Sequence, residues 1–304
     1  MRKRHFTTIS DLTDGEIYSI LEDARSIVST LGLRHDRVYT LSGRTAALAF
    51  FEPSTRTRLS FETASHRLGI SPVVFQVQGS SLEKGESLVE TVATIEAMCF
   101  DVIVIRHGTN GVVEKLAESS SIPVISAGEG TNSHPTQALL DVSALLESHG
   151  SVRGLKVGVV GDIRHSRVAR SQVTLLRRLG ASVRLCAPDE FLPTATDTGY
   201  DGLDRLDSIE DVLRWCDVLS LLRIQRERIG DNQVLSLEEY RKQYAFTAHV
   251  ASKHPNVTVI HPGPINNGVE VDEELVANSN VLIRRQVTHG VAVRMAVLRW
   301  LLGA

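Results

Sequence analysis

The chain has 304 residues, a length that corresponds to about two average domains. Hydrophobic residues make up 42% and charged residues 23%, as in most globular proteins, and the net charge of −3 argues against a general nucleic-acid-binding protein. No apolar run reaches the ~18 residues of a membrane span, and the basic N-terminal stretch lacks the apolar core of a secretory signal. We therefore expect a cytoplasmic protein that binds neither nucleic acid nor a membrane.

Short apolar runs rich in Val, Ile and Leu alternate with helical patterns along the chain. The predicted strands are Thr45–Phe51, Val102–Arg106, Pro123–Ser126, Leu155–Gly161, Ser182–Ala187, Val218–Ile224 and Val257–His261. The predicted helices include Asp11–Leu31, Thr57–Leu68, Gly111–Glu118, Pro135–Leu146, Val168–Leu179, Ile209–Trp215 and Gly290–Leu302. Continuously apolar strands are typical of parallel sheets covered on both faces, and strand–helix repetition indicates an α/β fold. The sequence thus predicts two doubly wound parallel-sheet domains joined by helices.

The three cysteines, Cys99, Cys186 and Cys216, are isolated in the sequence. Their spacing fits neither a metal site nor a disulfide framework. Their apolar surroundings predict buried thiols in a cytosolic protein. We expect no metal and no cofactor.

A candidate anion site follows the first predicted strand. Pro53 ends the strand, Ser54 can cap the next helix, and Thr55, Arg56 and Thr57 occupy its first turn. A helix N-terminus offers free N–H groups and partial positive charge, to which these hydroxyls and the guanidinium add donors. The segment therefore predicts a phosphate site at a strand end, where open α/β sheets bind ligands.

Residues Ser54–Arg58 (Ser-Thr-Arg-Thr-Arg) resemble the carbamoyl-phosphate motif of the aspartate/ornithine carbamoyltransferase family. The resemblance continues through Ser80–Ser87 (a mobile loop), Ile105–His107, Asn132–Gln137 (containing His-Pro-Thr-Gln) and Val160–Arg167. It implies a carbamoyl-phosphate site formed by Ser54, Thr55, Arg56, Thr57, Ser80, Arg106, His134, Gln137, Gly263 and Pro264. The residues implied in catalysis are Arg56, Thr57, Lys84, Arg106 and His134. Among these, Thr57, Arg106 and His134 would bind the carbonyl oxygen.

The second substrate distinguishes the branches of this family. Arg223-Ile224-Gln225 and His261-Pro262-Gly263-Pro264 resemble the aspartate branch, whereas the His-Cys-Leu-Pro and Ser-Met-Gly segments of the ornithine branch are missing. The resemblance implies that Lys84, Arg167, Arg223 and Gln225 bind aspartate, giving N-carbamoyl-L-aspartate for pyrimidine biosynthesis. The alternatives are an ornithine-type enzyme and a non-catalytic assembly subunit. An NAD-dependent dehydrogenase has only a fragment of its glycine fingerprint in Gly158–Gly161.

The resemblance also carries expectations about domains and assembly. We expect a carbamoyl-phosphate domain over 1–135 plus 287–304 and an aspartate domain over 136–286. Glu52 would pair with Arg167 and Arg228 on domain closure. A homotrimer with shared active sites is implied, with regulatory chains or dihydroorotase as possible further partners. Two positions depart from expectation: Asn267 stands where many relatives carry arginine, and Glu83 puts an acid into the anion-receiving loop.

Overall fold

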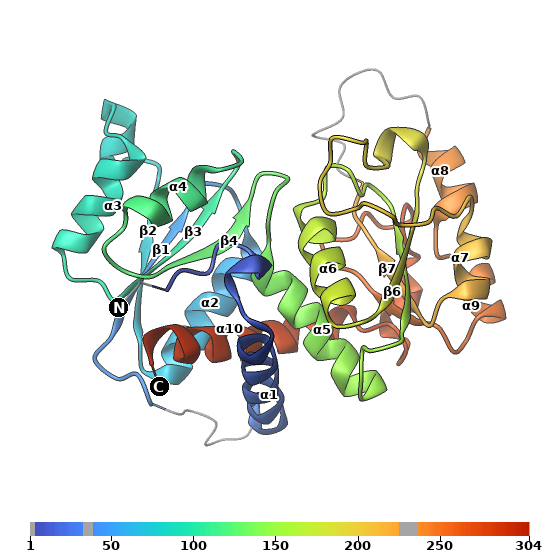
Figure 1. Cartoon of the computed structure of the whole chain (residues 1–304), viewed down its shortest axis with the longest axis horizontal. Coiled ribbons are helices and arrows are strands. Elements are labelled where there is room, and N and C mark those ends of the chain that lie inside the picture. The colour runs from blue at the N-terminus through green and yellow to red at the C-terminus, as the bar shows by residue number, and fades with distance from the viewer. Residues whose placement is uncertain (1–3, 33–38, 225–235, 304) are drawn as a thin grey trace. The chain divides into compact units, whose positions relative to one another are not determined.

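Two four-stranded parallel sheets organise the chain. The computed structural model describes residues 4–32, 39–224 and 236–303 (Figure 1). The chain divides into unit 1, residues 1–143 and 287–304, and unit 2, residues 144–286. Within the described residues, no helix is both long and apolar enough to cross a membrane.

The sheet of unit 1 has the strand order β2-β1-β3-β4. Its strands are β1 (Thr45–Phe50), β2 (Ser71–Phe75), β3 (Val102–His107) and β4 (Val124–Glu129). Its longer helices are α1 (Asp14–Thr30), α2 (Thr55–Leu68), α3 (Leu88–Ala97), α4 (Val112–Ser119) and the adjoining parts of α5 (Pro135–His149) and α10 (Ile283–Leu302). Alternate residues of β1 and β3, among them Ala47 and Ile103, pack against α3 and α4. Figure 1 shows α2 and α10 on the opposite side of the sheet.

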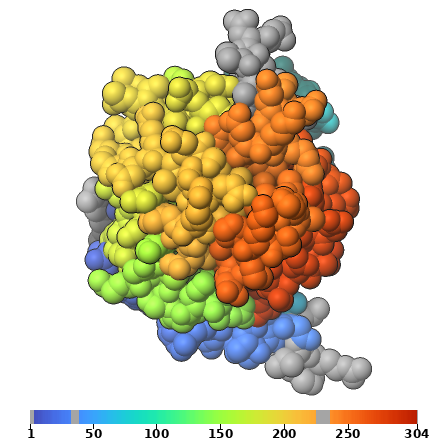
Figure 2. Space-filling view, turned by 90° about the vertical axis from the view of Figure 1, so that its right-hand side faces the viewer, coloured from blue at the N-terminus to red at the C-terminus, as the bar shows by residue number. Residues whose placement is uncertain are grey.

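The sheet of unit 2 has the strand order β6-β5-β7-β8. Its elements are β5 (Lys156–Val160), α6 (Arg167–Arg178), β6 (Ser182–Cys186), α7 (Ile209–Trp215), β7 (Val218–Leu221), α8 (Leu237–Tyr244), α9 (Ala248–Lys253) and β8 (Thr258–Ile260). On the face in Figure 2, the segment with α7 (gold) lies beside the orange segment with α8 and α9, and His254 Nε2 is 3.6 Å from Glu210 Oε2.

Helices cover both faces of this second sheet. Gly158 on β5 lies under α7, where an added Cβ would be only 2.2 Å from Val212 Cγ1. Gly158 pairs with Leu219 on β7, so the next residue, Ser220, points to the other face. There its hydroxyl donates to Gln172 Oε1 on α6 at 2.7 Å. The unit is therefore doubly wound, as the sequence predicts.

The seven predicted strands all form, with ends within three residues of the observed ones. β2, α3, α8 and α9 were not predicted. β2 is an edge strand and stays partly exposed along its whole length, although its residues Pro72–Phe75 form an apolar run that could have identified it. Helix α3 does carry a recognisable start, because Ser87 and Glu90 form a capping box.

The division between the units lies inside two continuous helices. It separates Ser143 from Ala144 within α5, and Gln286 from Val287 within α10. The boundary that we expected at residue 135 instead marks the start of α5. A helix that continues across the division gives no change in sequence pattern at the boundary itself.

Cys99 corrects the expectation of three buried thiols. Cys186 and Cys216 are buried, but Cys99 is exposed. It occupies the turn between α3 and β3, with a left-handed φ of 62°. Burial raises the pKa of Cys186 and of Cys216 to about 12, so both are protonated at neutral pH.

Asp101 joins the beginnings of two neighbouring strands. Its carboxylate accepts from the Thr45 backbone N–H at 2.8 Å and from Arg44 at 2.6 Å. Burial opposes ionisation, but these hydrogen bonds outweigh it and lower the pKa of Asp101. The carboxylate therefore stabilises the fold above its unfolded pKa, and this contribution is lost as the pH falls through the folded pKa.

We expect Asp101→Asn to lower the free energy of unfolding by about 1 kcal/mol at pH 7. The difference from the wild-type protein should shrink as the pH falls below about 4, where the unfolded carboxyl group begins to be protonated. Urea unfolding at several pH values measures this. A difference that stayed constant from pH 7 to pH 3 would show that the charge of Asp101 is unimportant.

Candidate active site

The N-terminus of α2 follows directly from β1. Ser54 takes the N-cap position with an extended φ of −159°, but its side chain makes no capping hydrogen bond, contrary to the predicted cap. Thr55 and Arg56 are exposed in the first turn, whereas Thr57 is 6% exposed. Ser54 thus leaves the first-turn N–H groups uncapped, next to hydroxyls and a guanidinium. This arrangement is suited to a phosphate dianion.

Arg106 lies near the end of β3, the neighbour of β1. Its backbone carbonyl accepts from Phe51 N–H at 2.9 Å, which fixes the strand ends against each other. Its guanidinium donates to the Ala127 carbonyl at 3.3 Å, and its Nε is 3.5 Å from Glu52 Oε2. Glu52, which we expected to pair with Arg167 and Arg228, contacts Arg106 within unit 1.

His134 follows β4 through a tightly bonded turn. Glu129 and Ser133 pair across this turn, and the Ser133 hydroxyl donates to the Thr7 carbonyl at 2.9 Å. Gly130 has a left-handed φ of 44°, and a Cβ there would be 1.9 Å from Asn110 Oδ1. The loops after β3 and β4 therefore approach so closely that no side chain fits at Gly130. His134 is 4% exposed and immediately precedes α5.

Most of the predicted carbamoyl-phosphate residues of unit 1 therefore lie at the ends of three adjacent strands. Parallel strands end at the same edge of a sheet, so the segments after β1, β3 and β4 share one edge. The segment after β1 carries Ser54–Thr57, Arg106 lies near the end of β3, and His134 follows β4. Several positive or polar donors at one edge can bind an anion and stabilise negative charge that develops on a carbonyl oxygen.

Ser80 and Lys84 belong to a separate loop before α3. The loop forms a short 3-10 helix, Ser81–Lys84, and the Ser80 hydroxyl donates to the Val77 carbonyl at 2.7 Å. Lys84 and Glu83 are exposed, and the ammonium group of Lys84 makes no ion pair with any described residue. The structure gives no reason for an acid at Glu83.

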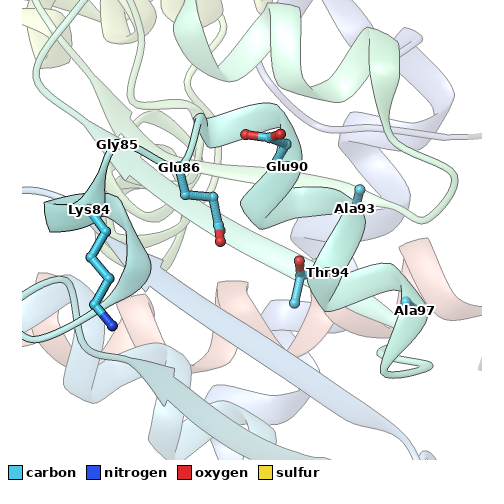
Figure 3. A pocket seen from close by; sticks show the side chains of 7 residues that line it. All are labelled: Lys84, Gly85, Glu86, Glu90, Ala93, Thr94 and Ala97. Atoms are coloured by element: carbon cyan, nitrogen blue, oxygen red, sulfur yellow. The ribbon is translucent and has the colours of Figure 1, made fainter.

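Lys84 lines an open hollow of about 670 Å³ along α3, together with Gly85, Glu86, Glu90, Ala93, Thr94 and Ala97. Figure 3 shows Lys84 and Glu86 projecting from the turn that precedes α3. None of the residues after β1, β3 or β4 lines this hollow. It presents two carboxylates beside one ammonium group, so its chemistry does not match a site for two anions.

In unit 2, Arg167 begins α6 at the end of β5. Gly161 has a φ of 127°, and a Cβ there would be 2.6 Å from the Leu222 carbonyl, so the turn requires glycine. The Ser166 hydroxyl caps α6 by accepting from Ala169 N–H at 3.1 Å. Arg167 is 8% exposed in the first turn. Arg167 is therefore a nearly buried cation in the segment that follows the carboxyl end of β5.

Arg223 follows β7, the strand next to β5, and its side chain contacts the loop after β8. Its Nε lies 3.4 Å from Asn266 Oδ1, and Asn266 Nδ2 donates to the Ile224 carbonyl at 3.0 Å. Gly263 and Pro264 lie at the start of the same loop and are joined by a cis peptide bond. The structure therefore brings Arg223 and the Gly263–Pro264 segment to one edge of the sheet in unit 2. Gln225 and Arg228 lie outside the described residues.

Glu270 joins these two loops and was missed by the sequence analysis. Its carboxylate accepts from Ile224 N–H at 2.7 Å, from Asn266 N–H at 2.8 Å and from Asn266 Nδ2 at 2.7 Å. Burial raises the pKa of Glu270, and these hydrogen bonds oppose the increase. Asn267, which stands where we expected arginine, donates to Glu273 at 2.6 Å, so a neutral hydrogen-bond donor occupies that position.

Comparison with known proteins covers both units. The family model described as "Aspartate/ornithine carbamoyltransferase, carbamoyl-P binding domain" matches residues 4–147, and the "Asp/Orn binding domain" model of the same family matches residues 153–301. The chain belongs to the aspartate/ornithine carbamoyltransferase family. In the described residues, no group of His, Cys, Asp and Glu side chains could hold a metal ion.

Individual carbamoyltransferases resemble the chain over nearly its whole length. The aspartate carbamoyltransferase catalytic subunit of Methylorubrum populi is 43% identical, with 97% of this chain and 93% of the relative covered. The crystal structure of the catalytic subunit of M. Jannaschii aspartate transcarbamoylase matches with a TM-score of 0.86 and 33% identity, covering 99% of this chain and 98% of that one. Aspartate transcarbamoylase from Trypanosoma cruzi, in complex with N-(phosphonacetyl)-L-aspartic acid, matches with a TM-score of 0.88 and 28% identity, covering 98% and 95%.

Proposed function

We propose that this chain transfers the carbamoyl group of carbamoyl phosphate to the amine of L-aspartate, giving N-carbamoyl-L-aspartate and phosphate. The observation that carries the proposal is the set of cationic and hydroxyl side chains at one edge of the sheet in unit 1. A second pair of arginines, Arg167 and Arg223, at the edge of the sheet in unit 2 suits a dicarboxylate. The identity with aspartate carbamoyltransferases supports the aspartate branch, and the product belongs to pyrimidine biosynthesis.

The residues of unit 1 bind and activate carbamoyl phosphate in this proposal. Ser54, Thr55 and Arg56, with Ser80, hold the phosphate, for which the uncapped turn of α2 supplies N–H donors. Thr57, Arg106 and His134 donate to the carbonyl oxygen, where negative charge grows as the amine attacks. Gln137, with the backbone carbonyls of Gly263 and Pro264, accepts from the carbamoyl NH₂ group.

Arginine and lysine side chains hold the aspartate. Arg167 and Arg223 bind its carboxylates through their planar forks, Gln225 helps to orient it, and Lys84 adds a further positive charge. The amine nitrogen attacks the carbamoyl carbon, the bond from that carbon to the phosphate oxygen breaks, and phosphate leaves. The departing phosphate accepts the proton that the amine loses, so the proposed reaction uses no side-chain base and no cofactor.

A homotrimer with shared active sites is part of the proposal. Leu59, Val73, Val89 and Met98 are large apolar side chains that unit 1 leaves exposed. They lie in the stretch that also carries Lys84, and exposed apolar side chains favour association with another surface. In a closed ring, the loop of one copy would supply Ser80 and Lys84 to its neighbour. We place the enzyme in the cytoplasm.

The reaction can be tested with purified protein. We expect phosphate release from carbamoyl phosphate that depends on L-aspartate and not on L-ornithine, without added metal or nucleotide. A carboxylate-binding arginine such as Arg223 would repel or fail to hold the cationic side chain of ornithine. Comparable turnover with ornithine would establish the ornithine-type alternative, and no turnover with either amine would favour a non-catalytic subunit.

A further inference from the structure

The side chain of Gln137 is hydrogen-bonded to a buried carboxylate. It lies in the first turn of α5, is 8% exposed, and its Nε2 donates to Asp141 Oδ1 at 2.8 Å one turn later. Asp141 is completely buried. An ionised carboxylate can only accept hydrogen bonds, so the end of the amide that faces it must be the NH₂ group. The carbonyl oxygen Oε1 therefore forms the other end of the Gln137 amide.

The guanidinium of Arg294 lies in the same buried region and is attracted to Asp141. The guanidinium is 3% exposed and donates to the Gly290 carbonyl at 2.8 Å and to Thr136 Oγ1 at 3.4 Å. Its carbon Cζ lies 5.1 Å from the centre of the Phe61 ring on α2. Burial lowers the pKa of Arg294 to about 9 despite its attraction to Asp141, so it remains charged at neutral pH. A buried positive charge of this kind favours the carboxylate form of its neighbour.

We propose that Asp141 determines selectivity for the carbamoyl group by fixing Gln137 as a hydrogen-bond acceptor. The inference rests on the proposed function, in which Gln137 meets the substrate NH₂. An acceptor favours NH₂ over a methyl group of similar size, because a methyl group leaves the acceptor without a partner. Asp141 does not touch substrate and acts through Gln137; Arg294 supports the charge of Asp141. The orientation of this one amide thus adds to the discrimination of the site against acetyl phosphate.

The test compares two unreactive ligands of nearly equal shape. Phosphonoacetamide carries an NH₂ group where acetonylphosphonate carries a methyl group. For the wild-type enzyme we expect the amide to bind about tenfold more tightly, as one net hydrogen bond can provide. Inhibition constants against carbamoyl phosphate measure this preference. Gln137→Met, which removes the acceptor, supplies the ratio that corresponds to no preference from this residue.

Asp141→Asn is the deciding variant. Arg294 attracts the oxygen of the amide introduced by this substitution, which leaves the new NH₂ group facing Gln137. Gln137 must then turn its own oxygen inward and its NH₂ outward. We expect the preference for phosphonoacetamide to fall about tenfold, to the ratio of Gln137→Met, while the affinity for acetonylphosphonate changes little. Asp141→Glu, which still only accepts, should keep the preference. An unchanged ratio in a folded Asp141→Asn enzyme would overturn the proposal.

Two further variants keep the test conclusive. Asp23→Asn removes another carboxylate that pairs with α10, since Asp23 Oδ1 lies 2.8 Å from Arg299, and it should leave the ratio unchanged. If Asp141→Asn does not fold, Asp141→Asn combined with Arg294→Met removes both charges of this buried pair. Gln137 could then take both orientations, and the preference should fall about twofold. No fall would contradict the proposal. Absence of wild-type turnover with aspartate would instead refute the proposed reaction.

Discussion

Replacing Arg223 with alanine should lower kcat/KM for aspartate by about 10²–10³-fold, the effect of losing one partner of a charged hydrogen-bonded pair. Arg223→Lys should recover only a small part of this activity. A lysine ammonium group is a single point of charge and cannot make the two parallel hydrogen bonds of a guanidinium to one carboxylate. Initial rates at varied aspartate and saturating carbamoyl phosphate measure both variants.

Binding of carbamoyl phosphate provides the internal control for this experiment. Arg223 belongs to unit 2, so its loss should leave the dissociation constant of carbamoyl phosphate nearly unchanged. Arg184→Ala is a matched variant, because Arg184 lies on the edge strand β6 of the same unit, where it stacks on Trp215. It should retain activity within about twofold, as surface substitutions away from a site usually do. An unchanged kcat/KM for aspartate in Arg223→Ala would remove Arg223 from the site.

Mixing two inactive variants should restore activity if active sites are shared between copies of the chain. Lys84→Ala and Arg223→Ala should each lose most activity alone. In a ring of three, every mixed trimer contains one intact site, formed with Arg223 of one copy and Lys84 of the next. Random reassembly of equal amounts makes about three quarters of the trimers mixed, so about one quarter of wild-type activity should return.

The mixing experiment has its own negative control. Arg167 and Arg223 both belong to unit 2 and lie at the same edge of its sheet, so mixing Arg167→Ala with Arg223→Ala should restore nothing. Subunit exchange is confirmed by native mass measurement. Recovery in neither mixture, with exchange demonstrated, would mean that Lys84 acts within its own chain or outside the site, and would leave the proposed reaction standing.

Sequence patterns predicted the strands whose residues are buried along nearly their whole length. The central strands, such as Val102–His107, are almost fully buried, and their apolar runs identify them. The half-exposed edge strand Ser71–Phe75 was not predicted. The capping box at Ser87 was a usable signal for α3, and Ser236 with Glu239 gives the same signal for α8. These helices could have been predicted from their N-terminal residues alone.

The residues of the candidate site also differ in whether the sequence predicts them. Residues such as Arg106 and His134 are predictable because they follow apolar strands and belong to recognisable motifs. Glu270 is different, since it acts by accepting from Ile224, which lies 46 positions earlier in the chain. Asp141 likewise looks like an ordinary helical residue until Arg294 is brought close by the fold. Buried carboxylates that act on other residues carry no local pattern, and only three-dimensional structure reveals them.

The interrupted course of the chain through unit 1 has a consequence for synthesis in the cell. Residues 144–286, the whole of unit 2, leave the ribosome before the last helical segment that completes unit 1. Until then Phe61 lacks the guanidinium of Arg294, and Phe6 lacks its contact with the Trp300 ring. Unit 1 therefore cannot complete its fold until residues 287–304, which follow all of unit 2 in the chain, have left the ribosome. A released chain that ended near residue 286 would contain all of unit 2 but only part of unit 1, and the surface of unit 1 left uncovered is what chaperones would meet.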